Sequence, residues 1–548
     1  MSRRARLALL VAAGVGLLAC SGSGQDDIVL ESRPTTVGAD GTTGPTPPAT
    51  AATDATALDA DVTLRADVAA RGPAISAAIR GVTTDSLSAE EMRVAGMTMN
   101  SWGGNPITRY NYVLGNAFNH GSDFEFRNTS YGRPAGPLAI DSVLAHQAAG
   151  QEYRLAIPTI GWIAKDADDD TCGFPGGSTG CLAQADAGTC SDQKQVADPT
   201  RTSVESTPEM VAAWLRQMAA AGAAPEYIAM DNEPDLWGIT HYDVHPNCPT
   251  YEEILATYLE YAEVVATEMP EAALLGPVVC CWYDYWNIAP GPEGDGDEDF
   301  LAYFLDGVRT HDERTGQRSL DYLDVHFYPQ SGVYNDDVDE ETSARRLRST
   351  QALWKPAYRD ESWIPEAIEF LPRMREVIAA HYPDTKLFVS EWNFGAEETM
   401  NGALAIADVL GIFGREGVEA ATYYRNPDAG SPGFLAFKLF GNYDDEGASF
   451  TGTTVAVANS EDDGATRVTS YGALDERTGT LRLMLVNRDP TAALTIDLET
   501  PGFTPAGDAR RFALTPADET SIVADSVDLA GPIELPASSI TLLVLQPS

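Results

Sequence analysis

The sequence predicts an α/β fold, a (β/α)8 TIM barrel joined to an additional all-β sandwich domain. Between about residues 80 and 440, short apolar runs rich in β-forming residues alternate with patterns of helical periodicity. From about residue 450 onward the helical periodicity disappears and only short β-like runs remain. Alternating strands and helices favour a parallel sheet with crossover helices, and consecutive short strands favour an antiparallel sandwich. At 548 residues the chain is long enough for both domains.

The barrel is expected to occupy residues 81–445. Its predicted strands are Met92–Trp102, Arg154–Ile160, Tyr227–Asp231, Ala273–Val279, Tyr322–Tyr328, Lys386–Glu391 and Ala420–Tyr424. Its predicted helices are Pro208–Ala221, Tyr251–Glu268, Asp299–Thr310, Ile364–Ala380 and Ala403–Phe413. About seven or eight strand–helix units in this length favour a closed barrel with long loops.

The helix predicted over Tyr251–Glu268 has the clearest pattern. Its apolar residues recur at helical spacing on one face, at Tyr251, Ile254, Leu255, Tyr258, Ala262 and Val265. Thr250 and Glu253 form a capping box at its start, and Pro270 follows its end.

The sandwich is expected over residues 446–548. Its predicted strands are Thr453–Ala458, Arg467–Leu474, Thr480–Val486, Leu494–Leu498, Arg511–Leu514 and Ile540–Leu545. Turn residues separate these runs, as at Asn487-Arg488-Asp489-Pro490. Residues 59–80 are also strand-like and precede the barrel, so we expect this segment to pair into the same sandwich.

The first residues form a targeting segment. Residues 1–19 combine a basic start with an apolar run too short to span a bilayer, as signal peptides do. The run ends in Leu17-Leu18-Ala19-Cys20, which resembles the bacterial lipobox, in which the cysteine is lipidated. We therefore expect export and a lipid anchor at Cys20 in the outer membrane, on its cell-surface or periplasmic face; secretion after a plain signal peptide is the alternative. Residues 20–58 have the Gly-, Thr- and Pro-rich composition of a flexible linker.

The cysteine count agrees with export. Apart from Cys20, the cysteines are Cys172, Cys181, Cys190, Cys248, Cys280 and Cys281. This even number predicts up to three disulfides in an oxidising compartment, although the sequence does not give their connectivity. We expect the adjacent Cys280 and Cys281 to bond to different partners, because neighbouring half-cystines close a strained ring.

An acidic loop is the one candidate metal site. Asp166, Asp168 and Asp170 lie in an inserted loop over residues 165–200, and hard oxygen ligands suit a structural Ca²⁺ ion. The spacing of an EF-hand is absent, so a solvated acidic loop is the simpler interpretation. No cofactor is expected to be required for activity.

The chain is strongly acidic, and this narrows the class of partners. Its 36 Lys and Arg residues stand against 81 Asp and Glu residues, a net charge of −45. Such a field repels nucleic acid and disfavours polyanionic substrates, so a neutral polymer is the better fit. We expect a monomer that meets the membrane only through its lipid anchor.

Two glutamates are the candidate catalytic residues. Glu233 follows the apolar run Tyr227–Met230, and Glu391 follows Leu387–Val389. Side chains at the carboxyl ends of barrel strands meet in one pocket. One carboxylic acid and one carboxylate at such a site can cleave a glycosidic bond.

The context of these glutamates resembles glycoside hydrolase family 44, the endoglucanase and xyloglucanase group of clan A. The matching segments are Ser101–Asn105, Thr108–Tyr112, Ile157–Trp162, Asp231–Trp237, Asp324–Pro329, Ser390–Gly395 and Ala436–Asp444. They occur in the family's order and cover roughly residues 60–548. The resemblance implies a retaining mechanism with Glu233 as general acid/base and Glu391 as nucleophile.

Further residues are candidates for substrate binding. Asn232 can hydrogen-bond the sugar 2-hydroxyl, and Tyr328 or Arg109 can keep Glu391 ionised. The aromatic candidates present faces on which pyranose rings stack. The full set is Asn232, Trp102, Asn105, Arg109, Tyr110, Trp237, His326, Tyr328 and Trp392. For His326 a role in the core is as plausible as one beside the substrate.

The function expected from these features is a retaining endo-β-1,4-glucanase that acts on cellulose-type β-glucans or xyloglucan. A related xylanase or mannanase would use the same two glutamates. The alternative from another class is a surface lipoprotein that binds polysaccharide without cleaving it, although a binding protein has no need of the glutamate pair.

Overall fold

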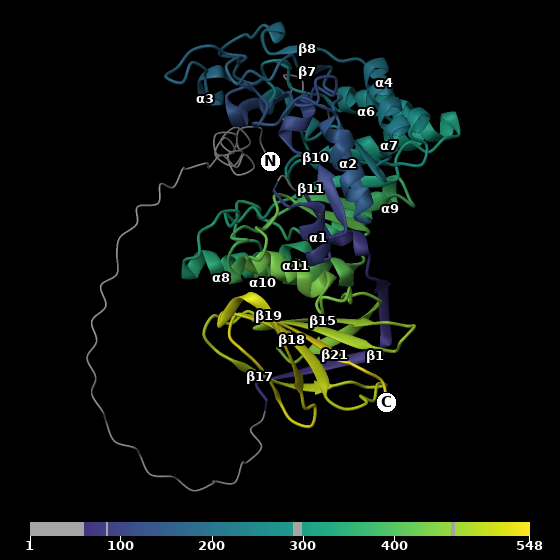
Figure 1. Ribbon diagram of the computed structural model, residues 1–548, viewed down its shortest axis with the longest axis vertical. Coiled ribbons are helices and arrows are strands. Elements are labelled where there is room, and N and C mark those ends of the chain that lie inside the picture. Colours follow the sequence, from purple (N-terminus) through teal and green to yellow (C-terminus); the bar gives the residue numbers. More distant parts are fainter. Residues whose placement is uncertain (1–59, 84–85, 289–298, 462–465) are drawn as a thin grey trace, which may run out of the picture.

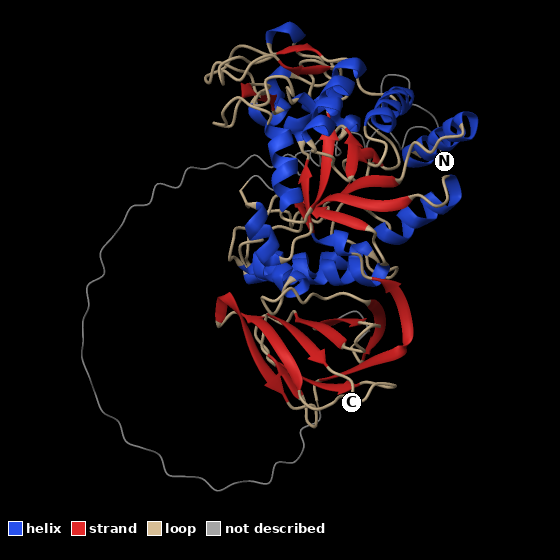
Figure 2. Ribbon diagram, turned by 45° about the vertical axis from the view of Figure 1, so that its right-hand side comes forward, coloured by secondary structure: helices blue, strands red, loops and turns tan. Residues whose placement is uncertain are grey.

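The structure is a computed structural model that describes residues 60–83, 86–288, 299–461 and 466–548. Within these residues a barrel with its helices lies on top of a β-rich domain, with a helical layer between them (Figures 1 and 2). The predicted signal peptide, the lipidation site Cys20 and the whole of the predicted linker lie outside the described residues. No described helix is both long and apolar enough to cross a bilayer.

Eight parallel strands close the barrel, which confirms the predicted fold class. Their order around the barrel is β10-β11-β12-β13-β2-β3-β6-β9. The strands are β2 (Gly81–Thr83), β3 (Met99–Trp102), β6 (Glu152–Ile157), β9 (Tyr227–Met230), β10 (Ala273–Val279), β11 (Tyr322–Phe327), β12 (Lys386–Trp392) and β13 (Ala420–Tyr423).

Helices surround this barrel. The longer ones are α1 (Ala89–Ala95), α2 (Leu138–Ala148), α4 (Pro208–Ala221), α6 (Tyr251–Glu268), α7 (Phe300–Thr315), α8 (Glu340–Ser349), α9 (Phe370–His381), α10 (Met400–Glu416) and α11 (Pro432–Gly441). Helix α6 has its predicted bounds, and the Thr250 hydroxyl accepts a hydrogen bond from the Glu253 amide at its start.

The first two strands of the barrel differ from the prediction. The strand predicted from Met92 is wrong in its first half, because Ser88 caps helix α1 there and Gly96 ends the helix with φ +66°. A Cβ atom at Gly96 would lie 2.2 Å from the Gly441 carbonyl carbon, so this close approach requires glycine. Strand β2 has only three residues, too few for its pattern to be recognised.

The second domain is one hydrogen-bonded set of nine strands around its own hydrophobic core. They are β1 (Val62–Ala74), β14 (Thr453–Asn459), β15 (Val468–Leu474), β16 (Leu481–Asn487), β17 (Leu494–Glu499), β18 (Ala509–Thr515), β19 (Asp518–Val527), β20 (Ile533–Leu535) and β21 (Ser539–Leu545). Strand β1 pairs antiparallel with β14 and parallel with β17. The expectation that an N-terminal segment completes the all-β domain is therefore confirmed.

Helix α10 joins the two domains. It lies between the barrel and the β-domain (Figure 1), and nearly all of its residues are buried. Its Asp408 accepts hydrogen bonds from the Thr350 hydroxyl (2.7 Å) and from the hydroxyl of Tyr471 in β15 (2.6 Å). Arg488 of the β-domain lies 3.6 Å from the same carboxylate.

Three disulfides are present, as the cysteine count predicted. They join Cys172 to Cys181, Cys190 to Cys248 and Cys280 to Cys281. The expectation that Cys280 and Cys281 bond to different partners is wrong. Cys172 and Cys181 bond within the segment between β6 and α4, and Cys190 of the same segment bonds Cys248 in the loop after β9. Cys280 and Cys281, which directly follow β10, bond to each other.

Candidate active site

Glu233 lies at the carboxyl end of strand β9, on a turn that neighbouring side chains hold. Asp231 and Glu233 both have left-handed backbones, with φ of +71° and +45°. The Asp231 carboxylate accepts hydrogen bonds from the Thr108 hydroxyl (2.6 Å) and the Thr159 amide (2.6 Å). The Glu233 amide donates to the Val278 carbonyl at 3.0 Å. Strained conformations of this kind concentrate at functional sites, where the surrounding structure imposes them.

Glu391 is the inward-facing residue near the end of strand β12, and it meets Glu233 across the barrel mouth. One oxygen of each glutamate and one nitrogen of His326 all lie within 4.8 Å of one another. His326 Nδ1 shares a 3.0 Å hydrogen bond with Glu233 Oε1 and lies 3.5 Å from Glu391 Oε2. Retaining glycosidases hold their two carboxyl groups about 5 Å apart, while inverting enzymes need room for a water between them.

Burial raises the pKa values of both glutamates. Desolvation, followed by the charge of Asp123, raises the pKa of Glu233 to about 8. Desolvation also raises the pKa of Glu391 to about 7, while His326 and the Tyr328 hydroxyl oppose the increase. Near neutral pH, Glu233 therefore keeps its proton more readily than Glu391, which is the order that an acid and a nucleophile need.

After His326, Tyr328 and Arg154 also lower the pKa of Glu391. The Tyr328 hydroxyl donates a 2.7 Å hydrogen bond to Glu391 Oε2, at the position predicted from the sequence. The nearby cation is Arg154 of strand β6, which the sequence analysis missed; it is 1% exposed and pairs with Asp324 at 2.8 Å. A lone arginine inside the apolar run of β6 is the signal that could have identified it.

Asn232 and Asn105 lie beside Glu233. The Asn232 side-chain oxygen accepts a hydrogen bond from the Gly104 amide at 3.1 Å, and its nitrogen donates to Asn105 Oδ1 at 3.3 Å. Asn105 in turn donates to Asp123 Oδ2 at 2.7 Å. These contacts connect the loop after β3 to the acid/base candidate.

Buried aspartates lie behind Glu233. Asp235 and Asp284 are 1% and 5% exposed, and burial raises the pKa values of both well above the ordinary range. The Glu233 charge adds to the shift in each case.

Four predicted substrate residues are core residues instead. Arg109 is fully buried and forms an ion pair with Asp243 at 3.0 Å. Tyr110 is 1% exposed and Trp237 is 2% exposed, so neither presents a ring face to a ligand. Trp392 points away from the pocket, because it follows Glu391 on the same strand, and it packs against Tyr423 at 4.8 Å.

The other aromatic and histidine candidates have different surroundings. Trp102 ends β3, packs edge-on against Tyr110 and keeps 8% exposure, so its contact with substrate stays a prediction. His326 is buried, as a core residue would be, yet it bonds Glu233 directly. Burial lowers the pKa of its imidazole, which favours the neutral form near pH 7.

The acidic loop does not assemble three ligands. The Asp168 carboxylate accepts hydrogen bonds from the Asp170 and Thr171 amides and from the Thr171 hydroxyl. Asp166 accepts one from Asn128 at 2.8 Å. Among the described residues, neither of the two His/Cys/Asp/Glu groups whose ligand atoms lie within 4.8 Å of one another contains Asp166, Asp168 or Asp170.

Comparisons with known proteins agree with this geometry. The sequence model of glycoside hydrolase family 44 matches residues 117–331. The structure of CelM2, a bifunctional glucanase-xylanase from a metagenome library, is 31% identical with a TM-score of 0.81, over 89% of this chain and 99% of that one. A Paenibacillus polymyxa xyloglucanase solved with xyloglucan has a TM-score of 0.76 at 23% identity, over 89% and 100% of the two chains, and shows the same fold.

A curated relative matches part of the chain. Endoglucanase A of Paenibacillus lautus is 32% identical over 275 residues, which make up 48% of this chain. The match spans only 39% of that relative's own length.

Proposed function

Because the chain belongs to glycoside hydrolase family 44, we propose that it is a retaining endo-β-1,4-glucanase that hydrolyses cellulose-type β-glucans and xyloglucan. The observation that carries this proposal is the pairing of Glu233 and Glu391, with oxygens within 4.8 Å of each other around His326. That separation suits direct attack by one carboxylate and leaves no room for an intervening water.

In the first step, Glu391 attacks the anomeric carbon and Glu233 donates its proton to the glycosidic oxygen. The glycosidic bond breaks, the shortened chain leaves as an alcohol, and an ester joins the sugar to Glu391. Tyr328 donates to Glu391 Oε2 and favours its ionised form before attack. His326 bonds Glu233 Oε1 and so fixes the direction of the acid.

In the second step, Glu233 acts as a base. It takes a proton from water, and the resulting hydroxide equivalent attacks the anomeric carbon and displaces Glu391. The product keeps the configuration of the substrate, and both glutamates return to their starting states. Asn232 lies beside Glu233, where its side chain can bond the 2-hydroxyl of the sugar being transferred.

The range of substrates is broader in the relatives than in a strict cellulase. The named relatives include a bifunctional glucanase-xylanase and a xyloglucanase. For this chain we propose neutral β-1,4-glucans first, and xylan is the second candidate because the most identical of these solved structures carries that activity in its name.

The test is an assay of wild type, Glu233→Gln and Glu391→Gln on carboxymethyl-cellulose, xyloglucan, xylan and mannan. We expect activity on the glucans and loss of it in both variants. Proton NMR of the first product should show the β-anomer. Wild-type activity in both variants, or an initial α-anomer, would contradict the proposal.

We further propose that the protein is exported as a monomer with a lipid anchor at Cys20. Labelling with a fatty-acid analogue should mark the wild type and not Cys20→Ser. The reaction draws its acid, base and nucleophile from the chain, so no cofactor is proposed. A structural Ca²⁺ at Asp166, Asp168 and Asp170 stays a prediction that metal analysis of the purified protein would test.

A further inference from the structure

Asp123 is an acidic residue of the active-site mouth that the proposed mechanism does not use. It lies in a short helical turn, Gly121–Phe124, in the loop between β3 and α2. Its side chain is 12% exposed. Oδ2 accepts a hydrogen bond from Asn105 at 2.7 Å, and the His120 ring lies 3.7 Å away. Oδ1 is buried and has no hydrogen-bond partner among the described residues.

The position of this carboxylate is fixed relative to the catalytic pair. Asn105 bonds both Asp123 and Asn232, so two hydrogen bonds connect Asp123 to the residue before Glu233. Burial is the main cause that raises the pKa values of Glu233 and Tyr424. The charge of Asp123 is among the neighbouring charges that raise both further. Glu233 and Tyr424 follow different strands of the barrel, β9 and β13. Through Asn105, Asp123 is held beside the loop that carries Glu233.

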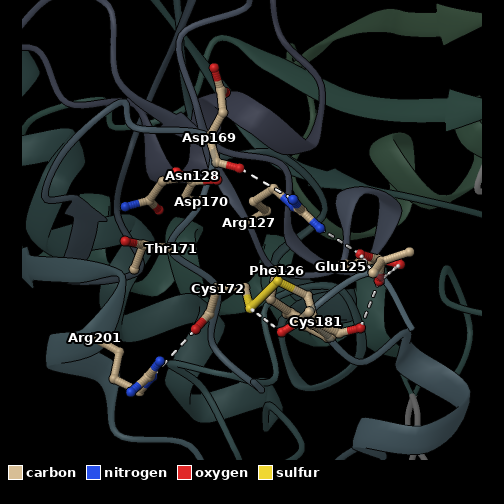
Figure 3. Close-up of a disulfide and its surroundings, with 12 residues drawn as sticks. Glu125, Phe126, Arg127, Asn128, Asp169, Asp170, Thr171, Cys172, Cys181 and Arg201 are labelled. Carbon is tan, nitrogen blue, oxygen red and sulfur yellow. Dashed lines mark hydrogen bonds and ion pairs between the residues drawn. A yellow bond between two sulfur atoms is a disulfide. The ribbon is translucent and has the colours of Figure 1, made fainter. Parts of the chain in front are cut away.

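The loop that carries Asp123 is braced from its far side. The bridge between Cys172 and Cys181 lies against residues 125–128 (Figure 3). Arg127 forms an ion pair with Glu125 at 2.9 Å and donates to the Asp169 carbonyl, and Arg201 donates to the Cys172 carbonyl. On the near side, a Cβ atom at Gly121 would lie 2.1 Å from the Thr240 carbonyl, so the turn packs tightly against the segment after Glu233.

A buried carboxylate oxygen without a hydrogen-bond partner destabilises the folded protein. Such a group is retained where a bound ligand supplies the missing hydrogen bond. We propose that Asp123 is a substrate-binding residue: its free Oδ1 accepts a hydrogen bond from a hydroxyl group of a neutral sugar, and its charge excludes a sugar carrying a carboxylate from the same subsite. The inference rests on the proposed glucanase function and adds to it the preference for uncharged sugar units.

Two variants and a control test this role. Asp123→Asn keeps an acceptor oxygen and removes the charge, whereas Asp123→Ala removes both. Asp141→Asn is the control: it removes one charge from helix α2, which follows this loop, and its side chain is exposed. The substrates are hydroxyethyl-cellulose, which is neutral, and carboxymethyl-cellulose, which is anionic on the same backbone.

We expect Asp123→Ala to reduce kcat/KM on the neutral polymer by about tenfold or more, the loss typical of a missing hydrogen bond to a charged group. In Asp123→Asn the ratio of anionic to neutral kcat/KM should rise about threefold or more, because the repulsion is gone. The groups facing Asp123 are His120, Glu233 and Tyr424. Loss of its charge should therefore move the basic limb of the pH profile, which reports Glu233, to lower pH. Asp141→Asn should behave as wild type.

Equal losses on both polymers with an unchanged pH profile would show a purely structural role and overturn the proposal. Asp123→Asn decides the case if Asp123→Ala does not fold. A wild type inactive on every polymer would refute the proposed function separately. Calorimetric titration with cellotetraose would then judge Asp123 alone, and equal affinities of wild type and Asp123→Ala would overturn it.

Discussion

Two regions of the molecule bury carboxylates but surround them with opposite kinds of neighbours. At the interface between the barrel and the β-domain, Asp408 is 1% exposed and is met by the Thr350 hydroxyl, the Tyr471 hydroxyl and Arg488. In the catalytic pocket, Glu233 and Glu391 are 7% and 6% exposed, but their hydrogen-bond partners are a neutral histidine and one tyrosine hydroxyl. The nearby cation, Arg154, is already paired with Asp324.

The difference shows that burial alone does not make a carboxylate reactive. Donors and a cation around Asp408 compensate the loss of water, so its charge ties two domains together. Around Glu233 the compensation is incomplete, and a neighbouring charge, Asp123, adds repulsion. The resulting free-energy cost raises the pKa of the acid toward the value that proton transfer needs. The buried carboxylates of the pocket therefore lower the stability of the fold and gain reactivity, whereas the carboxylate at the interface stabilises the fold.

The largest expected effect is the loss of activity in Glu391→Gln. Removal of a nucleophile should reduce kcat by a factor on the order of 10⁴ or more. The unfolding midpoint should stay the same or rise, because a poorly compensated buried charge has been removed. Kinetics and thermal unfolding measure the two quantities. Glu152→Gln is the control, since Glu152 begins β6 at the other end of the barrel and should keep full activity.

Asp408→Ala should show the reverse pattern. It leaves Arg488 and the buried Tyr471 hydroxyl without their acceptor, while the Thr350 hydroxyl keeps the Leu347 carbonyl, so we expect a loss of about 3–5 kcal/mol in the free energy of unfolding. Activity per folded molecule should stay within about twofold at temperatures well below the transition. Tyr471→Phe removes one hydrogen bond and should cost about 1–2 kcal/mol. An Asp408 variant that unfolds like wild type would remove the contrast between the two regions.

The disulfide Cys172–Cys181 lies next to the Asp123 loop and extends the comparison of pocket and interface, because it stabilises a loop of the pocket and not the contact between the domains. Changing Cys172 and Cys181 to Ser should cost about 2–3 kcal/mol, as expected for a short closed loop. It should also raise KM with little change in kcat, since Asp123 loses its brace. Changing Cys190 and Cys248, which close a longer loop, should cost about 4 kcal/mol. Denaturant unfolding and steady-state kinetics give the two readings.

Strand-end position identified the two glutamates and Asn232 in advance, but it did not separate the pocket from the core. Side chains alternate along a strand, so with Glu391 facing inward its neighbour Trp392 had to face the helices. Applying that alternation would have removed Trp392 from the substrate residues. Tyr110 follows a short helical turn (Asn105–Arg109) and Trp237 begins a four-residue helix (Trp237–Thr240), and neither is long enough for periodicity to tell which way a ring points.

Other features could not be predicted from the sequence, for physical reasons. Asp123 lies far along a loop without a repeating pattern, and only the folded chain brings it to Asn105. The pairing of Cys280 with Cys281 depends on where the other four cysteines find partners, which is a property of the tertiary fold. The short strand β2 is defined by its neighbours β13 and β3 and not by its own three residues.

The smallest expected effect concerns Tyr328. Its hydroxyl gives Glu391 a hydrogen-bond donor of the kind that surrounds Asp408. Its hydroxyl donates to Glu391 Oε2 and favours the ionised form, which holds the pKa of this glutamate lower than burial alone would. Tyr328→Phe removes that donor, so the pKa of Glu391 should rise above about 7. Because Glu391 must be ionised to attack, the acid limb of kcat/KM should move to higher pH.

At pH 6 the activity of Tyr328→Phe should therefore fall by about tenfold, with a smaller loss at pH 8. Tyr334→Phe is the matched control: its ring lies 4.9 Å from that of Tyr328, but its hydroxyl bonds Arg425 and not Glu391. A pH profile for Tyr328→Phe that falls uniformly, with both limbs in place, would mean that the hydroxyl positions the nucleophile without tuning its charge. The partial compensation of Glu391 would then have to come from His326 and Arg154 alone.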